Sequence, residues 1–181
     1  RQETALSLAH WVSQIEHNFP TPERSTAKGF YRVPDDYLWG GTEEEVIKKG
    51  SDWCTELARV YCVLCQIAHI PARIVACYDL AREFHGHCVN ELFLEEEWRF
   101  IDPQGNVYFE RPSGQWASAW QVMRKSGLIL RGEGHTAKWY LDPATDLAMA
   151  IVNYFVMDHH EYDYHWDPIN DYYRRILEPQ W

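Results

Sequence analysis

The sequence has no run of lysine or arginine, no long hydrophobic run, and no cationic leader followed by an apolar stretch. A nucleic-acid partner requires a clustered basic surface, and a net charge of −10 works against contact with a phosphate backbone. A transmembrane helix requires about 18 or more consecutive apolar residues, which this sequence does not contain. We therefore expect a soluble protein with no nucleic-acid partner and no membrane partner.

Repeats, low-complexity tracts and linkers are also missing, so no feature of the sequence divides it into separate units. A length of 181 residues suits one domain with a substantial core, and 46% apolar and 24% charged residues are an ordinary globular composition. We predict a single domain over residues 1–181. The nine tryptophans and eleven tyrosines indicate core and groove walls, or stacking against a sugar or peptide in a cleft.

The five cysteines are an odd number spread over expected helix and strand faces, which favours free thiols over a disulfide framework. Free thiols persist in a reducing compartment, so we expect a cytoplasmic location. Cys62 and Cys65 have the spacing of a redox or zinc pair, but their position in the middle of an expected helix favours core packing. The run at residues 158–165 could bind a metal, although a solvated tail is the simpler interpretation. We expect no metal and no cofactor.

Residues 50–61 (GSDWCTELARVY) place a cysteine in the first turn of an expected buried helix. Ser51 has the position of an N-cap, where its side chain would accept a hydrogen bond from the amide of Trp53 or Cys54. Cys54 would then be the third helical residue, where unpaired amides and the helix dipole lower the pKa of a thiol. Cys54 is a candidate nucleophile, and a buried structural cysteine is the alternative. Apolar residues at helical spacing predict a helix over residues 52–68: Cys54, Leu57, Ala58, Tyr61, Leu64, Cys65 and Ala68.

The other expected elements follow from periodicity, caps and turn residues. Helices are predicted at residues 3–17, from Thr42 to about Gly50, at 115–125, at 142–157 with Asp142 as N-cap, and from Asp167 onward. Strands are predicted at residues 72–78, 87–94, 98–102 and 128–131, and a long irregular segment at 20–41.

Two of these strands form an expected antiparallel hairpin with three glutamates at residues 95–97 in its turn. With a turn of two or four residues, Asp102 lies opposite Val89 and on the same face as His87, within reach as a diagonal neighbour. A turn of three residues would place Asp102 on the other face. A nucleophilic thiol requires a base and a group that orients it, which His87 and Asp102 can supply. His85 is a second candidate base, which faces the same way under strict alternation and can also line the cleft.

Four blocks in this order resemble the transglutaminase-like superfamily: residues 50–61, 70–75 (IPARIV), 86–91 (GHCVNE) and 98–103 (WRFIDP). The resemblance covers about residues 40–105 and implies an α+β fold of papain-like type. In that fold a central helix that carries the cysteine packs on an antiparallel sheet that carries the histidine and the aspartate. The resemblance assigns Cys54 as nucleophile, His87 as base and Asp102 as orienter. Residues 115–181 would add a helical, aromatic-rich C-terminal part.

The sequence departs from the family pattern at two positions. Val89 stands where an aromatic residue is common, and His69 stands where the family commonly has glycine. For the oxyanion, the Cys54 amide is a natural donor, and the side chain of Trp39 or Gln14 could supply a second one.

We expect a cysteine enzyme that attacks an amide or related carbonyl through a thioester, with hydrolysis favoured. The expected substrate is a peptide, protein or glycopeptide, and Trp39, Trp53 and His85 are the candidate substrate-binding residues. One alternative is a protein-glutamine amine transferase that cross-links proteins. Another is a catalytically silent domain that binds a peptide or glycan.

Overall fold

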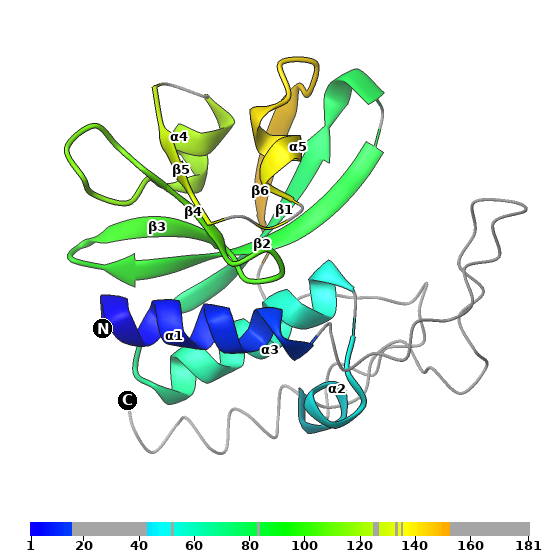
Figure 1. The fold of residues 1–181 in the computed structure, drawn as a ribbon, viewed down its shortest axis with the longest axis vertical. Coiled ribbons are helices and arrows are strands. Elements are labelled where there is room, and N and C mark those ends of the chain that lie inside the picture. Colours follow the sequence, from blue (N-terminus) through cyan, green and yellow to red (C-terminus); the bar gives the residue numbers. More distant parts are fainter. Residues whose placement is uncertain are drawn as a thin grey trace, which may run out of the picture.

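The fold is built on a six-stranded antiparallel sheet in a computed structural model that describes residues 1–15, 43–51, 53–82, 84–124, 127–132, 134 and 136–152 (Figure 1). The strand order is β5-β4-β3-β2-β1-β6, and every neighbouring pair is antiparallel. The strands are β1 (Ala72–Asp79), β2 (Phe84–Leu94), β3 (Glu97–Asp102), β4 (Val107–Glu110), β5 (Ile129–Arg131) and β6 (Leu147–Val152).

Helices cover both faces of this sheet. On one face α3 (Cys54–Ile67) packs across β1 and β2, and α1 (Gln2–Ser13) and α2 (Glu43–Lys49) pack against α3 (Figure 1). On the other face lie α4 (Ala119–Met123) and α5 (Ala137–Leu141), and a short 3-10 turn, Leu80–Arg82, follows β1. In the described part of the chain, no helix is both long enough and apolar enough to cross a bilayer. The α+β class and the helix packed on an antiparallel sheet are confirmed.

Each face of the sheet has its own apolar core, because successive side chains of a strand point to opposite sides. The core under α3 contains Leu57, Tyr61, Leu92 and Ile101, together with residues of α1. The opposite core is more aromatic and includes Val89, Phe100, Phe109 and Tyr140.

The predicted register of the β2–β3 hairpin is confirmed. Leu94 pairs with Glu97 and Asn90 pairs with Ile101, so the turn has two residues and the next position places Asp102 opposite Val89. Glu95 and Glu96 form this turn with φ values of +52° and +63°, as a type I′ hairpin turn requires. The tight turn therefore sets the face on which Asp102 lies.

The predicted helix at residues 142–157 is wrong. Residues 147–152 form β6, in which all six residues pair with β1, and Asp142 is the C-cap of α5 instead of the N-cap of a new helix. A short apolar run does not by itself distinguish a buried helix from a strand, and here the open edge of β1 decides. The predicted helix at 115–125 is shorter, since α4 begins only after Ser118, which forms a capping box with Gln121.

Most other expected elements are confirmed with shifted ends. The first helix ends earlier than predicted, the strand after α3 and the strand at 129–131 are present, and α2 ends at Lys49, just before Gly50. The end of α3 explains one departure from the family pattern, because His69 has a φ of +57°, a conformation that glycine adopts without strain. The predicted features at residues 20–41, 158–165 and 167 onward lie outside the described residues.

The β2–β3 turn gives a prediction about stability. Two glutamates in the left-handed region cost conformational energy that asparagine and glycine avoid. We expect the double substitution Glu95→Asn and Glu96→Gly to raise the free energy of unfolding by about 1–2 kcal/mol in urea denaturation. The matched control, Glu95→Gln with Glu96→Gln, removes the same charges without relieving the backbone. An equal gain in the control would mean that charge repulsion, and not backbone strain, limits this turn.

Candidate active site

Cys54 is the first residue of α3, and Trp53 is the N-cap with an extended backbone (φ −88°, ψ 122°). The prediction that Cys54 is the third helical residue is therefore wrong by two positions. The expected hydrogen bond is present nevertheless, because the Trp53 amide donates to Ser51 Oγ at 3.1 Å. Ser51 Oγ in turn donates to a carboxylate oxygen of Glu56. These bonds hold Trp53 in place next to Cys54, and the helix begins after them, at Cys54.

Buried polar contacts fix the start of α3 over the sheet. Asn90 Nδ2 on β2 donates to the carbonyl oxygen of Ala58 at 2.9 Å, and Arg59 forms a buried ion pair with Glu43 of α2 at 2.6 Å. A buried carbonyl or charge that loses its partner is costly, so these contacts restrict how the helix can slide. Asn90 belongs to the block of residues 86–91, and its role here is structural.

His87 and Asp102 form a buried hydrogen-bonded pair across the hairpin. His87 Nε2 lies 2.8 Å from Asp102 Oδ2, and the two residues are 8% and 0% exposed. Asp102 Oδ1 accepts backbone N–H groups of Gln104 at 3.1 Å and Gly105 at 3.4 Å. Because Nε2 is bound by the carboxylate, Nδ1 is the ring nitrogen left for the thiol. The carboxylate therefore fixes both the tautomer and the direction of the imidazole.

The Cys54 thiol completes a chain of contacts with this pair. Its side chain hydrogen-bonds with Cys88 and with His87, and both contacts, helped by the charge of His87, lower the pKa of Cys54 far below its usual range against the effect of burial. Burial disfavours the imidazolium, but the charge of Asp102 and the contacts with Asp102 and Cys54 raise the pKa of His87 to about 10. A thiolate and an imidazolium are thus the favoured charge states at neutral pH.

The other four cysteines are buried, whereas Cys54 is partly exposed. Burial raises the pKa of Cys65 to about 12, and it also raises the pKa of Cys62 and Cys77. Hydrogen bonding to Cys54 and burial raise the pKa of Cys88. Cys62 and Cys65 lie in the interior of α3, as predicted for core residues. Only Cys54 combines access with a stabilised thiolate.

The structure brings Cys54, His87 and Asp102 together. Of the three candidate substrate-binding residues, the structure describes the side chain of Trp53 alone. Trp53 directly precedes Cys54, but Trp39 lies outside the described residues, as does the side chain of His85. The β1–β2 register shifts between Cys77 and Tyr78, so the pairing along this part of β2 is not strictly regular. Gln14 donates to Ser13 Oγ at the end of α1.

Sequence reasoning missed two residues of this site. Tyr140 Oη donates to Asp102 Oδ2 at 3.1 Å, and Cys88 contacts the Cys54 thiol. Tyr140 lies in the short helix α5, which no periodic pattern predicts and which ends just before Asp142, the expected start of a later helix. Cys88 could have been found from alternation, since it neighbours His87 and faces α3.

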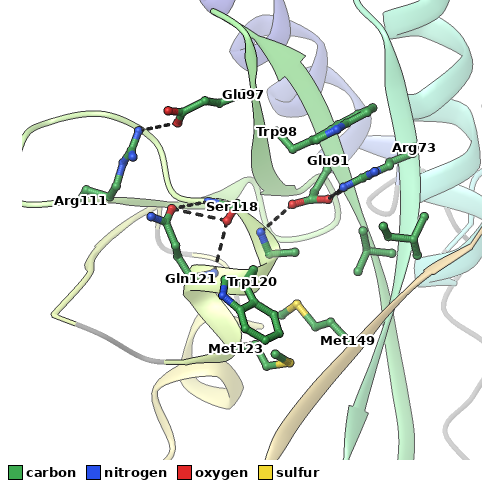
Figure 2. Close-up of a pocket in the computed structure, with 13 residues that line it drawn as sticks. Arg73, Glu91, Glu97, Trp98, Arg111, Ser118, Trp120, Gln121, Met123 and Met149 are labelled. Carbon is green, nitrogen blue, oxygen red and sulfur yellow. Dashed lines mark hydrogen bonds and ion pairs between the residues drawn. The ribbon is translucent and has the colours of Figure 1, made fainter.

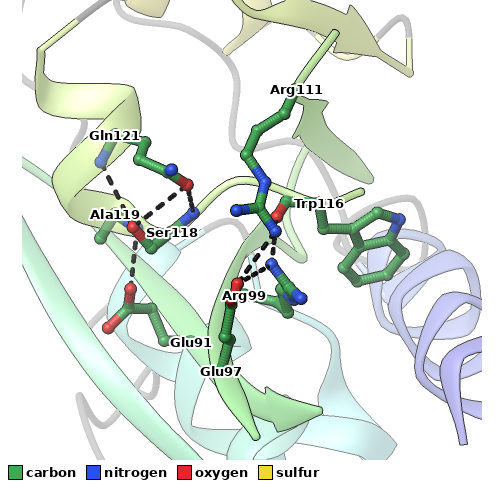
Figure 3. Close-up of polar contacts among 8 residues, drawn as sticks. All are labelled: Glu91, Glu97, Arg99, Arg111, Trp116, Ser118, Ala119 and Gln121. Carbon is green, nitrogen blue, oxygen red and sulfur yellow. Dashed lines mark hydrogen bonds and ion pairs between the residues drawn. The ribbon is translucent and has the colours of Figure 1, made fainter. Parts of the chain in front are cut away.

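A second polar network lies farther along β2 and holds α4 on the sheet (Figure 3). Glu91 Oε1 accepts the backbone N–H of Ala119 at 2.7 Å, and its other oxygen pairs with Arg73 at 2.6 Å. Arg99 donates to the carbonyl oxygen of Trp116 at 2.7 Å and to Glu97. Glu91 thus fixes the start of α4.

An open pocket with a volume of about 520 Å³ lies beside this network (Figure 2). Figure 2 shows Trp120, Met123 and Met149 gathered at one end and Arg73 with Glu91 at the other. Cys54, His87 and Asp102 do not line it. Glu91 is four residues from His87, which corresponds to about 13 Å along a strand. The pocket is therefore separate from the site around Cys54.

The model of the transglutaminase-like superfamily matches residues 3–103 of this chain, more than half of its length and well beyond the four blocks quoted above. The chain belongs to this superfamily, and this membership points to cysteine-based catalysis. Comparison with curated proteins and with solved structures finds no match.

The contacts of Cys54 predict how its reactivity depends on pH. A lowered thiol pKa leaves the thiolate present at acidic pH, so alkylation by iodoacetamide should reach its plateau below pH 7, against about 8.5 for an ordinary thiol. His87→Ala removes a hydrogen bond and a positive charge and should shift the acid limb to higher pH. Peptide mapping by mass spectrometry assigns the modified cysteine, and the four buried cysteines serve as internal controls. Identical profiles for the variant and the parent would contradict the contact between Cys54 and His87.

Proposed function

We propose that this protein is a cysteine acyl-transfer enzyme in which Cys54 attacks the carbonyl carbon of an amide and water releases the product. The observation that carries the proposal is the continuous set of contacts from the Cys54 thiol through His87 to the buried Asp102. A partly exposed thiol joined to a buried imidazole and carboxylate has the parts that nucleophilic catalysis requires.

In the first step Cys54 Sγ forms a bond to the carbonyl carbon, and the bond from that carbon to the amide nitrogen breaks. The His87 imidazolium gives its proton to the leaving amine, so a thioester and a neutral imidazole remain. In the second step His87 takes a proton from water, whose oxygen attacks the thioester carbon and displaces the Cys54 thiolate. Asp102 stays ionised throughout and stabilises the imidazolium each time it forms.

The start of α3 supplies a place for the negative oxygen of the tetrahedral intermediates. The first N–H groups of a helix have no carbonyl partner within it, and Cys54 is the first residue of α3. An oxyanion beside the Cys54 amide would gain from that donor and from the positive end of the helix dipole. We assign the Cys54 amide as one oxyanion donor.

We propose a peptide, protein or glycopeptide as the acyl donor, and a reducing compartment in which Cys54 remains a thiolate. Water is the proposed acceptor because no group in the described part of the site is arranged to select an amine. Transfer to a primary amine, as in protein cross-linking, is the alternative reaction.

The test is to trap the thioester and follow its fate. Peptidyl p-nitrophenyl esters should release p-nitrophenol in a burst and leave an acyl group on Cys54, detected by intact mass and peptide mapping. Added primary amine then competes with water, and mostly acid product supports hydrolysis, whereas mostly amide product supports cross-linking. A folded protein that forms no acyl adduct with a panel of esters would favour a silent binding domain.

The surroundings of Asp102 give a sharper prediction. In Asp102→Asn the amide oxygen can keep the Gln104 and Gly105 N–H bonds, which turns the NH₂ group toward His87 and favours the wrong imidazole tautomer. The rate of single-turnover acylation of Cys54 should fall by about 10³–10⁴-fold, as the same change does in a serine-protease triad. The circular dichroism spectrum should stay unchanged.

A matched control is Asp79→Asn, another buried aspartate whose Oδ1 accepts two backbone N–H groups, from Ala81 and Asp146. It makes the same chemical change away from the contacts of His87, so its acylation rate should stay within about twofold of the parent. A loss of less than threefold in folded Asp102→Asn would remove Asp102 from the proposed mechanism.

A further inference from the structure

Tyr140 shares an acceptor atom with His87. Its Oη donates to Asp102 Oδ2 at 3.1 Å, and His87 Nε2 lies 2.8 Å from the same oxygen. With two backbone N–H groups on Oδ1, both oxygens of the carboxylate are engaged by the protein. Tyr140 itself is 1% exposed, so this hydrogen bond is shielded from water.

The segment that leads into α5, the helix that carries Tyr140, lies close against the turn after Asp102. A Cβ atom on Gly105 would lie 2.2 Å from Thr136 Oγ1, and one on Gly134 would lie 2.1 Å from the carbonyl oxygen of Gly105. The contact at Gly134 is with backbone atoms and excludes a side chain there, whereas the one at Gly105 is with a side-chain hydroxyl. The close approach at Gly134 limits how far the segment leading into α5 can move relative to the turn after Asp102.

The ring of Tyr140 is held as firmly as its hydroxyl. It makes edge contacts with Phe100 and Phe109 at centroid distances of 5.4 and 5.7 Å, and it lies 6.3 Å from the His87 ring. Burial first, and then the charges of Asp102 and Cys77 and contact with Asp102, raise the pKa of Tyr140, so the phenol keeps its proton. Its titratable neighbours are Asp102, His87, Cys77 and Cys54.

We infer that Tyr140 is a positioning residue that holds Asp102 Oδ2 against His87 and thereby sets the direction of the imidazole toward Cys54. This inference rests on the proposed function for its catalytic consequence. The geometric part concerns the ion pair of Cys54 and His87 alone, and it can be measured without any substrate. The phenol acts through Asp102 and does not contact the thiol or the acyl group.

The test is Tyr140→Phe, which keeps the ring and its packing and removes only the hydroxyl. A carboxylate that loses this donor orients His87 less well, so the imidazolium stabilises the Cys54 thiolate less. The midpoint of iodoacetamide labelling of Cys54 should move up by about one pH unit, with about tenfold slower labelling on the acid limb. In single-turnover acylation the rate constant should fall by a similar factor while KM stays unchanged.

The matched control is Tyr61→Phe. Tyr61 is also fully buried, and its Oη donates to the carbonyl oxygen of Ala5 at 3.0 Å in the opposite core. This variant should lose thermal stability to a similar extent and leave the labelling profile of Cys54 in place. An equal shift in both variants would show a general effect of destabilisation and overturn the inference, as would a Tyr140→Phe profile that overlays the parent or moves to lower pH.

A double-mutant cycle tests whether Tyr140 acts through Asp102. In the Asp102→Asn background, Tyr140→Phe should change the labelling rate by less than twofold, whereas an independent effect of about tenfold would overturn the inference. If ester assays detect no acylation but the labelling shift and the coupling appear, the proposed function fails and the positioning role stands. If acylation is normal and the labelling shift is absent, the proposed function stands and the positioning role of Tyr140 fails.

Discussion

A fully buried carboxylate is the constraint around which this site is arranged. An ionised Asp102 without partners would be strongly disfavoured in an apolar core, so the protein surrounds it with two backbone N–H groups, the His87 ring and the Tyr140 phenol. Burial alone would raise the pKa of Asp102, yet the charge and hydrogen bond of His87 keep that pKa below its usual range. The carboxylate in turn keeps His87 charged, and His87 favours the Cys54 thiolate. The charge state of Cys54 thus depends on how well the buried charge of Asp102 is stabilised.

These contacts are possible because β2 extends beyond β3. β2 pairs with β1 from Phe84 onward, but its pairing with β3 begins only at Asn90, so the segment that carries His87 has β1 as its partner on one side alone. Cys54 begins the helix that packs on one face of the sheet, whereas Asp102 is bound by Tyr140 from the core on the other face.

The position of Asp102 on the same face as His87 could be predicted because a local pattern determines it. The Cys54 helix, the hairpin turn and its register are set by periodicity and by a two-residue turn, and these place His87 and Asp102 on one face. The β6 strand could not be predicted, since residues 147–152 become a strand only because β1 offers an open edge. The role of Tyr140 could not be predicted either, because it depends on how the segment leading into α5 packs on Gly105. That contact joins distant parts of the sequence. Non-local pairing leaves no period in the sequence.

Two sets of buried contacts bear differently on whether this fold is catalytic or silent. Asn90 and Glu91, in the block of residues 86–91, tie α3 and α4 to the sheet, so a binding domain would need them as much as an enzyme does. The buried pair of His87 and Asp102 is different, because a buried ion pair is often no more stabilising than apolar residues of the same volume. A silent domain would gain little by keeping this pair, the phenol that holds it and a partly exposed thiol in contact with it. The presence of these groups together is the reason that we favour the proposed chemistry at Cys54 over a purely structural role.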